Sequence, residues 1–165
     1  MANSEHVNKL KEGVSSWNKW RQDNPDIVPD LGWANLVSLD LREVILSNSN
    51  LKLAFCRDCI LVNADFQSAN LYGTNFQNSN LAGANLENAN LEGAHITNAD
   101  LTGANLKACN LKLTNFDGSN LTNTNLLGVK KLNIKQLLQV KSLKDARLDG
   151  AFFEQIKIQA SHLLD

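Results

Sequence analysis

Large apolar residues recur at every fifth position along most of this chain, from residue 30 to residue 128. The fourteen most regular repeats are centred on Leu61, Phe66, Leu71, Phe76, Leu81, Leu86, Leu91, Ile96, Leu101, Leu106, Leu111, Phe116, Leu121 and Leu126. The same phase extends back through Leu51, Leu46, Leu41, Leu36 and Leu31, with Cys56 as the one centre that is not a large hydrophobe. A period of five fits neither the 3.6-residue period of a helix nor the 2-residue period of a strand. We therefore expect a coil in which the chain turns after every five residues.

Each repeat combines inward, outward and corner positions. The position two residues before the centre holds a small residue, such as Ala84 or Ala89. Because side chains alternate along a short extended segment, the centre and this small residue both point inward. The residue between them points outward, and it is Asn in ten of the fourteen repeats. Asn bonds readily to neighbouring main-chain groups and suits turns. In most repeats the position two residues after the centre holds Gly or Asn, as at Gly83 and Asn88. Both residue types tolerate positive φ. This position is the predicted corner.

These repeated positions resemble the pentapeptide-repeat protein family. The resemblance covers roughly 100 of the 165 residues. It implies a right-handed quadrilateral parallel β-helix with four repeats per turn. On that basis the fold class is an all-β solenoid with helical caps, and the twenty centres from Leu31 to Leu126 make about five coils. At a strand spacing of ~4.8 Å, this shaft is roughly 24 Å long.

The flanking segments are expected to cap the two open ends of the solenoid, where strand edges and core are otherwise exposed. We divide the chain into an N-terminal capping helix and linker (1–29), a β-helix (30–128) and a C-terminal helical cap (129–165). One helix is predicted over Ser4–Gln22, with Ser4 as N-cap and Pro25 ending it. Its apolar stripe is Val7, Leu10, Val14 and Trp17.

The C-terminal cap leaves one alternative open. Asn133 can cap a short helix with apolar residues from Ile134 onward. Residues 150–163 fit either a sixth coil or a second helix capped by Asp149. The helix is favoured because Ile156 is too bulky for the small inner position of a repeat.

No catalytic, cofactor-binding or metal-binding residues are predicted, and we do not expect an enzyme. His6, His95 and His162 are scattered over segments that do not converge on one face. Cys56 and Cys59 have the CxxC spacing, but both occupy inward positions, which favours buried packing residues. A disulfide between them, or a metal or redox role, remains the alternative.

Two non-enzymatic functions are compatible with the sequence. The first is a binding or scaffolding module that presents a rigid surface of amides to another protein of unknown identity. The second follows from the resemblance, because some family members look like B-form DNA and bind DNA gyrase. Residues 30–128 carry nine acidic and five basic residues, a net charge of −4, whereas ~24 Å of duplex DNA carries about fourteen charges. The first function is therefore favoured.

Composition completes the set of expectations. No basic region is interleaved with aromatic residues, which disfavours direct nucleic-acid binding. There is no apolar run long enough to span a membrane and no signal-peptide pattern at the N-terminus, so a cytoplasmic location is expected. A small-molecule substrate is not expected, and the protein should be a monomer or weak dimer.

Overall fold

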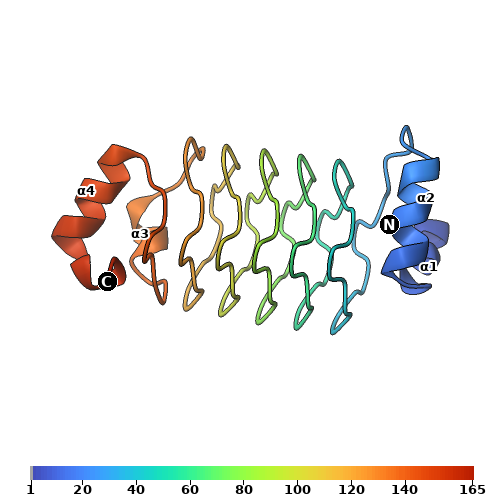
Figure 1. The fold of residues 1–165 in the computed structure, drawn as a ribbon, viewed down its shortest axis with the longest axis horizontal. Helices are drawn as coiled ribbons and strands as arrows, with labels where there is room; N and C mark the ends of the chain where they lie inside the picture. Colours follow the sequence, from blue (N-terminus) through green and yellow to red (C-terminus); the bar gives the residue numbers. More distant parts are fainter. Residues whose placement is uncertain (1) are drawn as a thin grey trace.

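The central part of the molecule is a shaft of stacked coils with helices at both ends (Figure 1). This arrangement is seen in a computed structural model, which describes residues 2–165. Parallel bridges connect residues twenty positions apart, from Asp30↔Asn50 to Asn110↔Lys130, so each turn contains four repeats. Each repeat contributes a single bridging residue, and no longer strand occurs within residues 2–165.

The main-chain hydrogen bonds of one repeat explain why the outward residue is Asn. In the repeat 84–88, the amides of Leu86 and Asn88 donate to the following coil at 2.8 and 3.0 Å. The amide of Asn85 donates to the preceding coil at 2.9 Å, and that of Ala84 closes the turn at 3.0 Å. The fifth amide, of Glu87, donates to the Oδ1 atom of Asn85 at 3.2 Å. A side-chain acceptor at the outward position therefore completes the hydrogen bonding of the repeat.

The corners have the predicted backbone conformation. All twenty corner positions from Trp33 to Gly128 have φ between 56° and 70°. Glycine and Asn adopt this left-handed region readily, whereas it is strained for bulky residues. Trp33, Leu53 and Leu113 nevertheless occupy such corners. Their presence there needs an explanation other than local backbone preference.

The interior of the shaft is filled by the centres and the small residues two positions before them. Leu91 and Ala94, for example, are both completely buried. Thr74 takes the small inner position in its repeat, and its hydroxyl donates to the carbonyl oxygen of Leu51 at 2.8 Å. Polar residues at this position are thus compatible with a dry core because their hydroxyls find main-chain acceptors. The inside and outside positions predicted from the sequence are confirmed.

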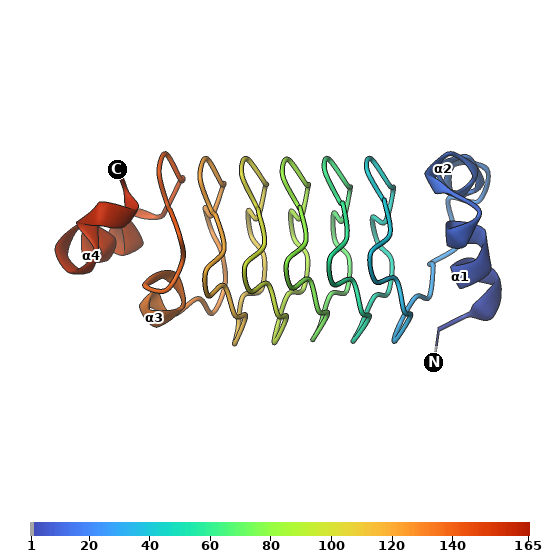
Figure 2. The ribbon, with the colours of Figure 1, turned by 90° about the horizontal axis from the view of Figure 1, so that it is seen from below.

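The N-terminal cap differs from the prediction. The single helix expected over Ser4–Gln22 is two helices, α1 (Ser4–Lys11) and α2 (Val14–Asp23), which pack across the first coil (Figures 1 and 2). They are separated at Gly13, whose φ of 119° is incompatible with a continuing helix. The expectation that Ser4 is the N-cap was also wrong. Asn3 occupies that position, and its Oδ1 accepts from the amide of Glu5 at 2.9 Å.

The C-terminal cap contains α3 (Ile134–Leu137), α4 (Gly150–Gln159) and a 3₁₀ turn, η1 (Ser161–Leu163). Asn133 caps α3 as predicted. Residues from Gly150 onward form a helix rather than a coil, and Asp149 occupies its N-cap position as predicted, but the Asp149 side chain makes no capping hydrogen bond. Its carboxylate instead accepts from the amide of Gly128. Between the helices, Ser142 and Arg147 bridge to the last coil, so part of a further coil precedes α4.

Candidate protein-binding surface

The outward Asn residues form ladders along the shaft. In one column, the Nδ2 atoms of Asn85, Asn105 and Asn125 each donate to the Oδ1 atom one coil earlier, at 3.2, 3.3 and 3.0 Å. Each of these accepting oxygens, on Asp65, Asn85 and Asn105, also accepts a main-chain amide of its own repeat. Much of their hydrogen-bonding capacity is therefore used within the shaft. This weakens the expectation that a surface of free amides recognises a partner.

A second kind of surface occurs where large apolar residues replace the usual outward Asn and corner Gly. Phe55 stands at an outward position and Trp33 at a corner, and their exposed fractions are 46% and 55%. Exposed aromatic side chains cost free energy in water and are typical of binding sites when they cluster. The sequence prediction missed both residues. The available signal was their departure from the repeat pattern at positions that face outward.

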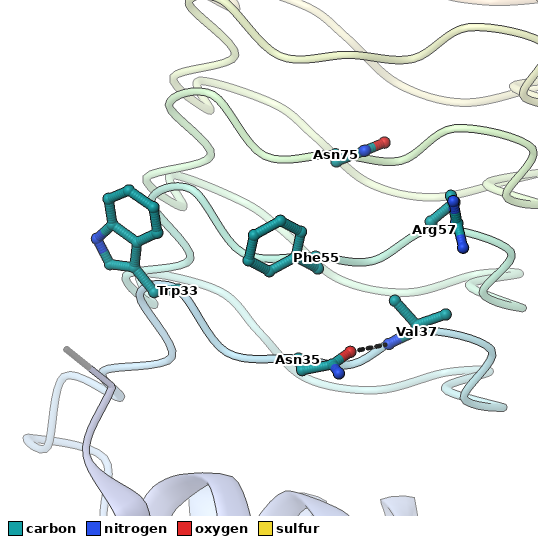
Figure 3. Close-up of a pocket in the computed structure, with 6 residues that line it drawn as sticks. All are labelled: Trp33, Asn35, Val37, Phe55, Arg57 and Asn75. Atoms are coloured by element: carbon teal, nitrogen blue, oxygen red, sulfur yellow. Dashed lines mark hydrogen bonds between the residues drawn. The ribbon is translucent and has the colours of Figure 1, made fainter.

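These two aromatic residues line an open hollow of about 470 Å³ near the N-terminal end of the shaft. We call it the aromatic hollow; it is lined by Trp33, Asn35, Val37, Phe55, Arg57 and Asn75. Figure 3 shows that these side chains come from three successive coils, with Asn35 and Val37 on the first coil. The amide of Val37 donates to the Oδ1 atom of Asn35 at 3.2 Å, which fixes the Asn35 side chain. The lining is therefore held by the regular main-chain lattice of the coils.

The charges around the aromatic hollow are paired. The Nε atom of Arg57 lies 3.1 Å from a carboxylate oxygen of Asp58, and Arg42 lies 3.4 Å from Asp40. Both pairs are about half exposed, so their contribution to stability is small. The pairing still leaves the rim with little net charge. The surface is thus suited to an apolar, uncharged ligand rather than to a polyanion.

An aromatic–cation pair lies on the neighbouring repeats. The Nζ atom of Lys52 is 5.3 Å from the centre of the Tyr72 ring, within the range of a cation–π interaction. Tyr72 is 40% exposed. This pair extends the aromatic character of the surface away from the aromatic hollow.

The cysteines are buried free thiols, as the packing interpretation expected. Burial is the main cause that raises the pKa of the Cys56 and Cys59 thiols. Burial also raises the pKa of Cys109 to about 12. The neutral thiol is thus favoured, and the Sγ atom of Cys59 lies 2.9 Å from the carbonyl oxygen of Leu36. A reactive or metal-binding thiolate is disfavoured by this environment.

The histidines do not come together at a site. His6 lies in α1, and its Nδ1 atom accepts from the amide of Asp30 at 3.0 Å. His95 takes an outward position and bridges to Asn75 and Asn115, while His162 lies in η1. Within residues 2–165, no group of three or more His, Cys, Asp or Glu side chains could hold a metal ion. Across the same residues, every helix is too short or too polar to cross a membrane.

Comparison with known proteins identifies the repeats. The sequence profile described as pentapeptide repeats matches residues 59–98 and 99–130, in 8 copies. The crystal structure of alr5209, a pentapeptide repeat protein from Nostoc PCC 7120, is 24% identical, with a TM-score of 0.50. That match covers 78% of this chain and 95% of alr5209, and it shows the same fold.

Two further solved structures match with lower TM-scores. The pentapeptide repeat protein Rfr23 from the cyanobacterium Cyanothece 51142 is 35% identical, over 67% of this chain and 64% of Rfr23, with a TM-score of 0.28. Full-length QnrB1, a plasmid-mediated fluoroquinolone resistance protein, is 21% identical, over 78% of this chain and 71% of QnrB1, with a TM-score of 0.22. No protein of curated function matches this chain.

Proposed function

Because this chain belongs to the pentapeptide-repeat family, we propose that it is a non-catalytic module that binds another protein through the aromatic hollow. The observation that carries the proposal is the pair of half-exposed aromatic residues, Trp33 and Phe55, at positions where the repeat usually has Gly or Asn. In our proposal the protein acts in the cytoplasm, as a monomer or weak dimer.

The scaffold favours binding because it is ordered before a partner arrives. The lining residues sit on coils whose main-chain amides bond from one coil to the next at 2.7–3.1 Å, as at Leu36 and Phe55. Little further conformational entropy is lost on association, so more of the contact energy appears as affinity. Trp and Arg are among the residues that dominate binding energy at protein interfaces, and Phe is enriched there. Trp33, Phe55 and Arg57 supply all of these within one hollow.

The chemistry of the lining supports binding rather than catalysis. The six residues are two aromatics, two amides, one aliphatic residue and one guanidinium. None of these can act as a nucleophile or as a general base at neutral pH. The hollow also lies open on the outer surface of a filled shaft, where bulk water reaches any bound molecule. Exclusion of water, which most enzymes need, is therefore not provided.

Charge does not support the alternative function as a DNA mimic that binds gyrase. A mimic requires a dense negative surface, and residues 30–128 have a net charge of only −4. Near the aromatic hollow, Asp40 and Asp58 are each neutralised by an arginine. Inhibition of gyrase supercoiling by micromolar protein would contradict the proposal and favour the mimic.

The proposal can be tested by affinity capture with variants that restore the usual repeat residues. The double variant Trp33→Gly, Phe55→Asn removes both aromatic rings without violating the repeat pattern. The matched control is Leu113→Gly, because Leu113 stands at the same kind of corner and is 74% exposed. From lysate of the native cell, partners should bind the unmodified protein and the control but not the double variant. Capture of the same proteins by all three would contradict the assignment of the aromatic hollow.

A further inference from the structure

The first coil exposes main-chain groups that later coils use for stacking. A coil has four sides, one for each repeat. On each side of a later coil, three main-chain groups bond to the preceding coil. They are the amide and the carbonyl of the outward residue, and the carbonyl of the residue two positions after it. For example, the amide of Asn75 donates to the coil before it at 3.0 Å, and the carbonyls of Asn75 and Gln77 accept from that coil at 2.8 and 2.9 Å. The first coil has no preceding coil to supply these partners. An open parallel edge is thus created wherever the cap does not replace them.

The N-terminal helices replace these partners on the side of the coil that contains Ile45. The amide of Ile45 donates to the Oδ1 atom of Asn18 at 2.8 Å, and its carbonyl accepts from Nε1 of Trp17 at 2.8 Å. The carbonyl of Ser47 accepts from a guanidinium nitrogen of Arg21 at 3.0 Å. Side chains of α2 therefore take the place of a preceding repeat on this side.

A second side, which contains Asp30, is covered by the start of α1. The amide of Asp30 donates to Nδ1 of His6 at 3.0 Å, and its carbonyl accepts from the amide of Asn3 at 3.0 Å. The cap thus supplies hydrogen-bonding partners for two of the four sides.

The other two sides of the first coil remain unpaired. Among residues 2–165, nothing bonds to the main-chain amide or carbonyl of Asn35 or Asp40, or to the carbonyls of Val37 and Arg42. Asn35 and Asp40 are both exposed. These groups form an edge that can accept one more strand. The C-terminal end differs, because residues 130, 139, 142, 144 and 147 bond to all four sides of the last coil.

One of the open sides is continuous with the aromatic hollow. Asn35 and Val37 provide the unpaired main-chain groups, and their side chains also line the hollow beside Phe55 (Figure 3). A strand added at this edge would place its outward side chains in line with those of Asn35 and Val37, at the edge of the hollow that these two residues form. Since Arg57 is paired with Asp58, no unpaired charge in the hollow calls for a charged residue in that strand.

We propose that the partner inserts an uncharged, extended segment that adds a parallel strand to residues 34–38 and places an apolar side chain beside Asn35, at the edge of the aromatic hollow. The parallel direction follows from the bridges of the shaft, all of which are parallel. Three main-chain hydrogen bonds, to Asn35 and Val37, fix its register, and the aromatic residues select its side chain. This inference rests on the proposed function and names the kind of segment that is bound.

The first test uses the full chain and a defined peptide. The probe is the end-blocked peptide Gly-Thr-Phe-Asn-Gln-Asn-Ser, which is the sequence of residues 73–79 with residues 75 and 76 exchanged. The exchange puts Phe at the outward position, in line with Asn35, and the peptide carries no charge. At millimolar peptide, NMR should show saturable shifts at residues 34–38 and slower hydrogen exchange of the Asn35 amide. Affinity should change less than about twofold between low and high salt, because no net charge is neutralised. No saturable shift at these residues would overturn the proposal.

A matched pair of variants tests the hydrogen bonds. Asn35→Pro removes the main-chain donor and also the side-chain acceptor for the Val37 amide, whereas Asn35→Ala removes only the latter. Asn35→Pro should weaken binding by about fivefold or more relative to Asn35→Ala, as expected for a lost hydrogen bond. Equal affinities would overturn the edge pairing.

The same measurements separate this proposal from its competitors. If exchange of the Asn35 amide slows with protein concentration in the absence of peptide, the occupant is a second copy and the proposal is wrong. Failure of the peptide to bind while capture still depends on Phe55 would overturn the added strand and leave the proposed function standing. Capture that does not depend on Phe55 would instead contradict the proposed function.

Discussion

Replacing Phe55 with Asn tests whether the aromatic ring serves binding rather than folding. The ring is 46% exposed, so the substitution loses roughly half of the ~1.5–3 kcal/mol that a fully buried Phe contributes. In return, the new Oδ1 atom can accept from the amide of Arg57, which has no hydrogen-bond partner within residues 2–165. Other repeats make this bond at 2.8–3.3 Å, as Asp117 and Arg42 do, and it contributes about 1 kcal/mol. The two terms nearly cancel, so the free energy of unfolding should change by no more than about 1 kcal/mol.

The control for this experiment is a Phe of the core. Phe76 is completely buried, and Phe76→Ala should lower the free energy of unfolding by about 3–5 kcal/mol. Urea unfolding followed by circular dichroism measures both variants under identical conditions. Phe55→Asn should keep near-normal stability while it loses the captured partner. If it destabilises the protein as much as Phe76→Ala does, Phe55 is a packing residue and the reasoning for the aromatic hollow fails.

Three further predictions concern the shaft. Leu91→Ala should lower the free energy of unfolding by about 2–5 kcal/mol because Leu91 is fully buried. Glu92→Ala, which breaks a surface ion pair, should lower it by at most about 1 kcal/mol. Equal losses of stability in thermal melts would contradict the inward and outward assignment of these positions. Gly83→Ala should destabilise more than Gly103→Ala, since both corners have φ near 70° but only the first has an Asn side chain of the preceding coil in the way; urea titrations giving equal midpoints would argue against that contact. Burial raises the pKa of the Cys109 thiol to about 12, so the stability that the neutral thiol contributes is complete below the unfolded pKa near 8.5 and is lost as the pH rises toward 12. Between about pH 9 and pH 12, the free energy of unfolding should therefore fall less for Cys109→Ala than for the unmodified protein. If urea titrations give parallel plots of this free energy against pH for the two proteins, the role of burial is refuted.

The shaft could be predicted from the sequence because each of its rules is local and repeated. A residue such as Leu86 is a centre, Ala84 is small, and Asn88 can adopt positive φ, and the same choices recur about twenty times. The ends could be predicted less well because they lack repetition. Gly13 alone divides the N-terminal helix, and the carboxylate of Asp149 bonds to a distant amide rather than to its own helix.

The binding surface could not be predicted by the same rules because it is made of exceptions to them. Trp33 and Phe55 are 22 residues apart in the sequence and line the same hollow only because one turn of the shaft is twenty residues long. The open edge at Asn35 was also hidden, since the sequence indicates that a cap exists but not which main-chain groups it reaches. Bonds such as that from Trp17 to Ile45 depend on how α2 crosses the coil.

The most direct test of a protein-binding role for the aromatic hollow is site-specific photocrosslinking in the native cell. A photoreactive residue at Val37 lies in the hollow, and the same residue at Gln67 lies two sides further round the coil as a matched outward control. The account predicts that one protein is crosslinked through position 37, that position 67 gives no such product, and that Phe55→Asn abolishes the crosslink. Crosslinking of the same protein through position 67, or a crosslink at position 37 that persists in Phe55→Asn, would contradict it.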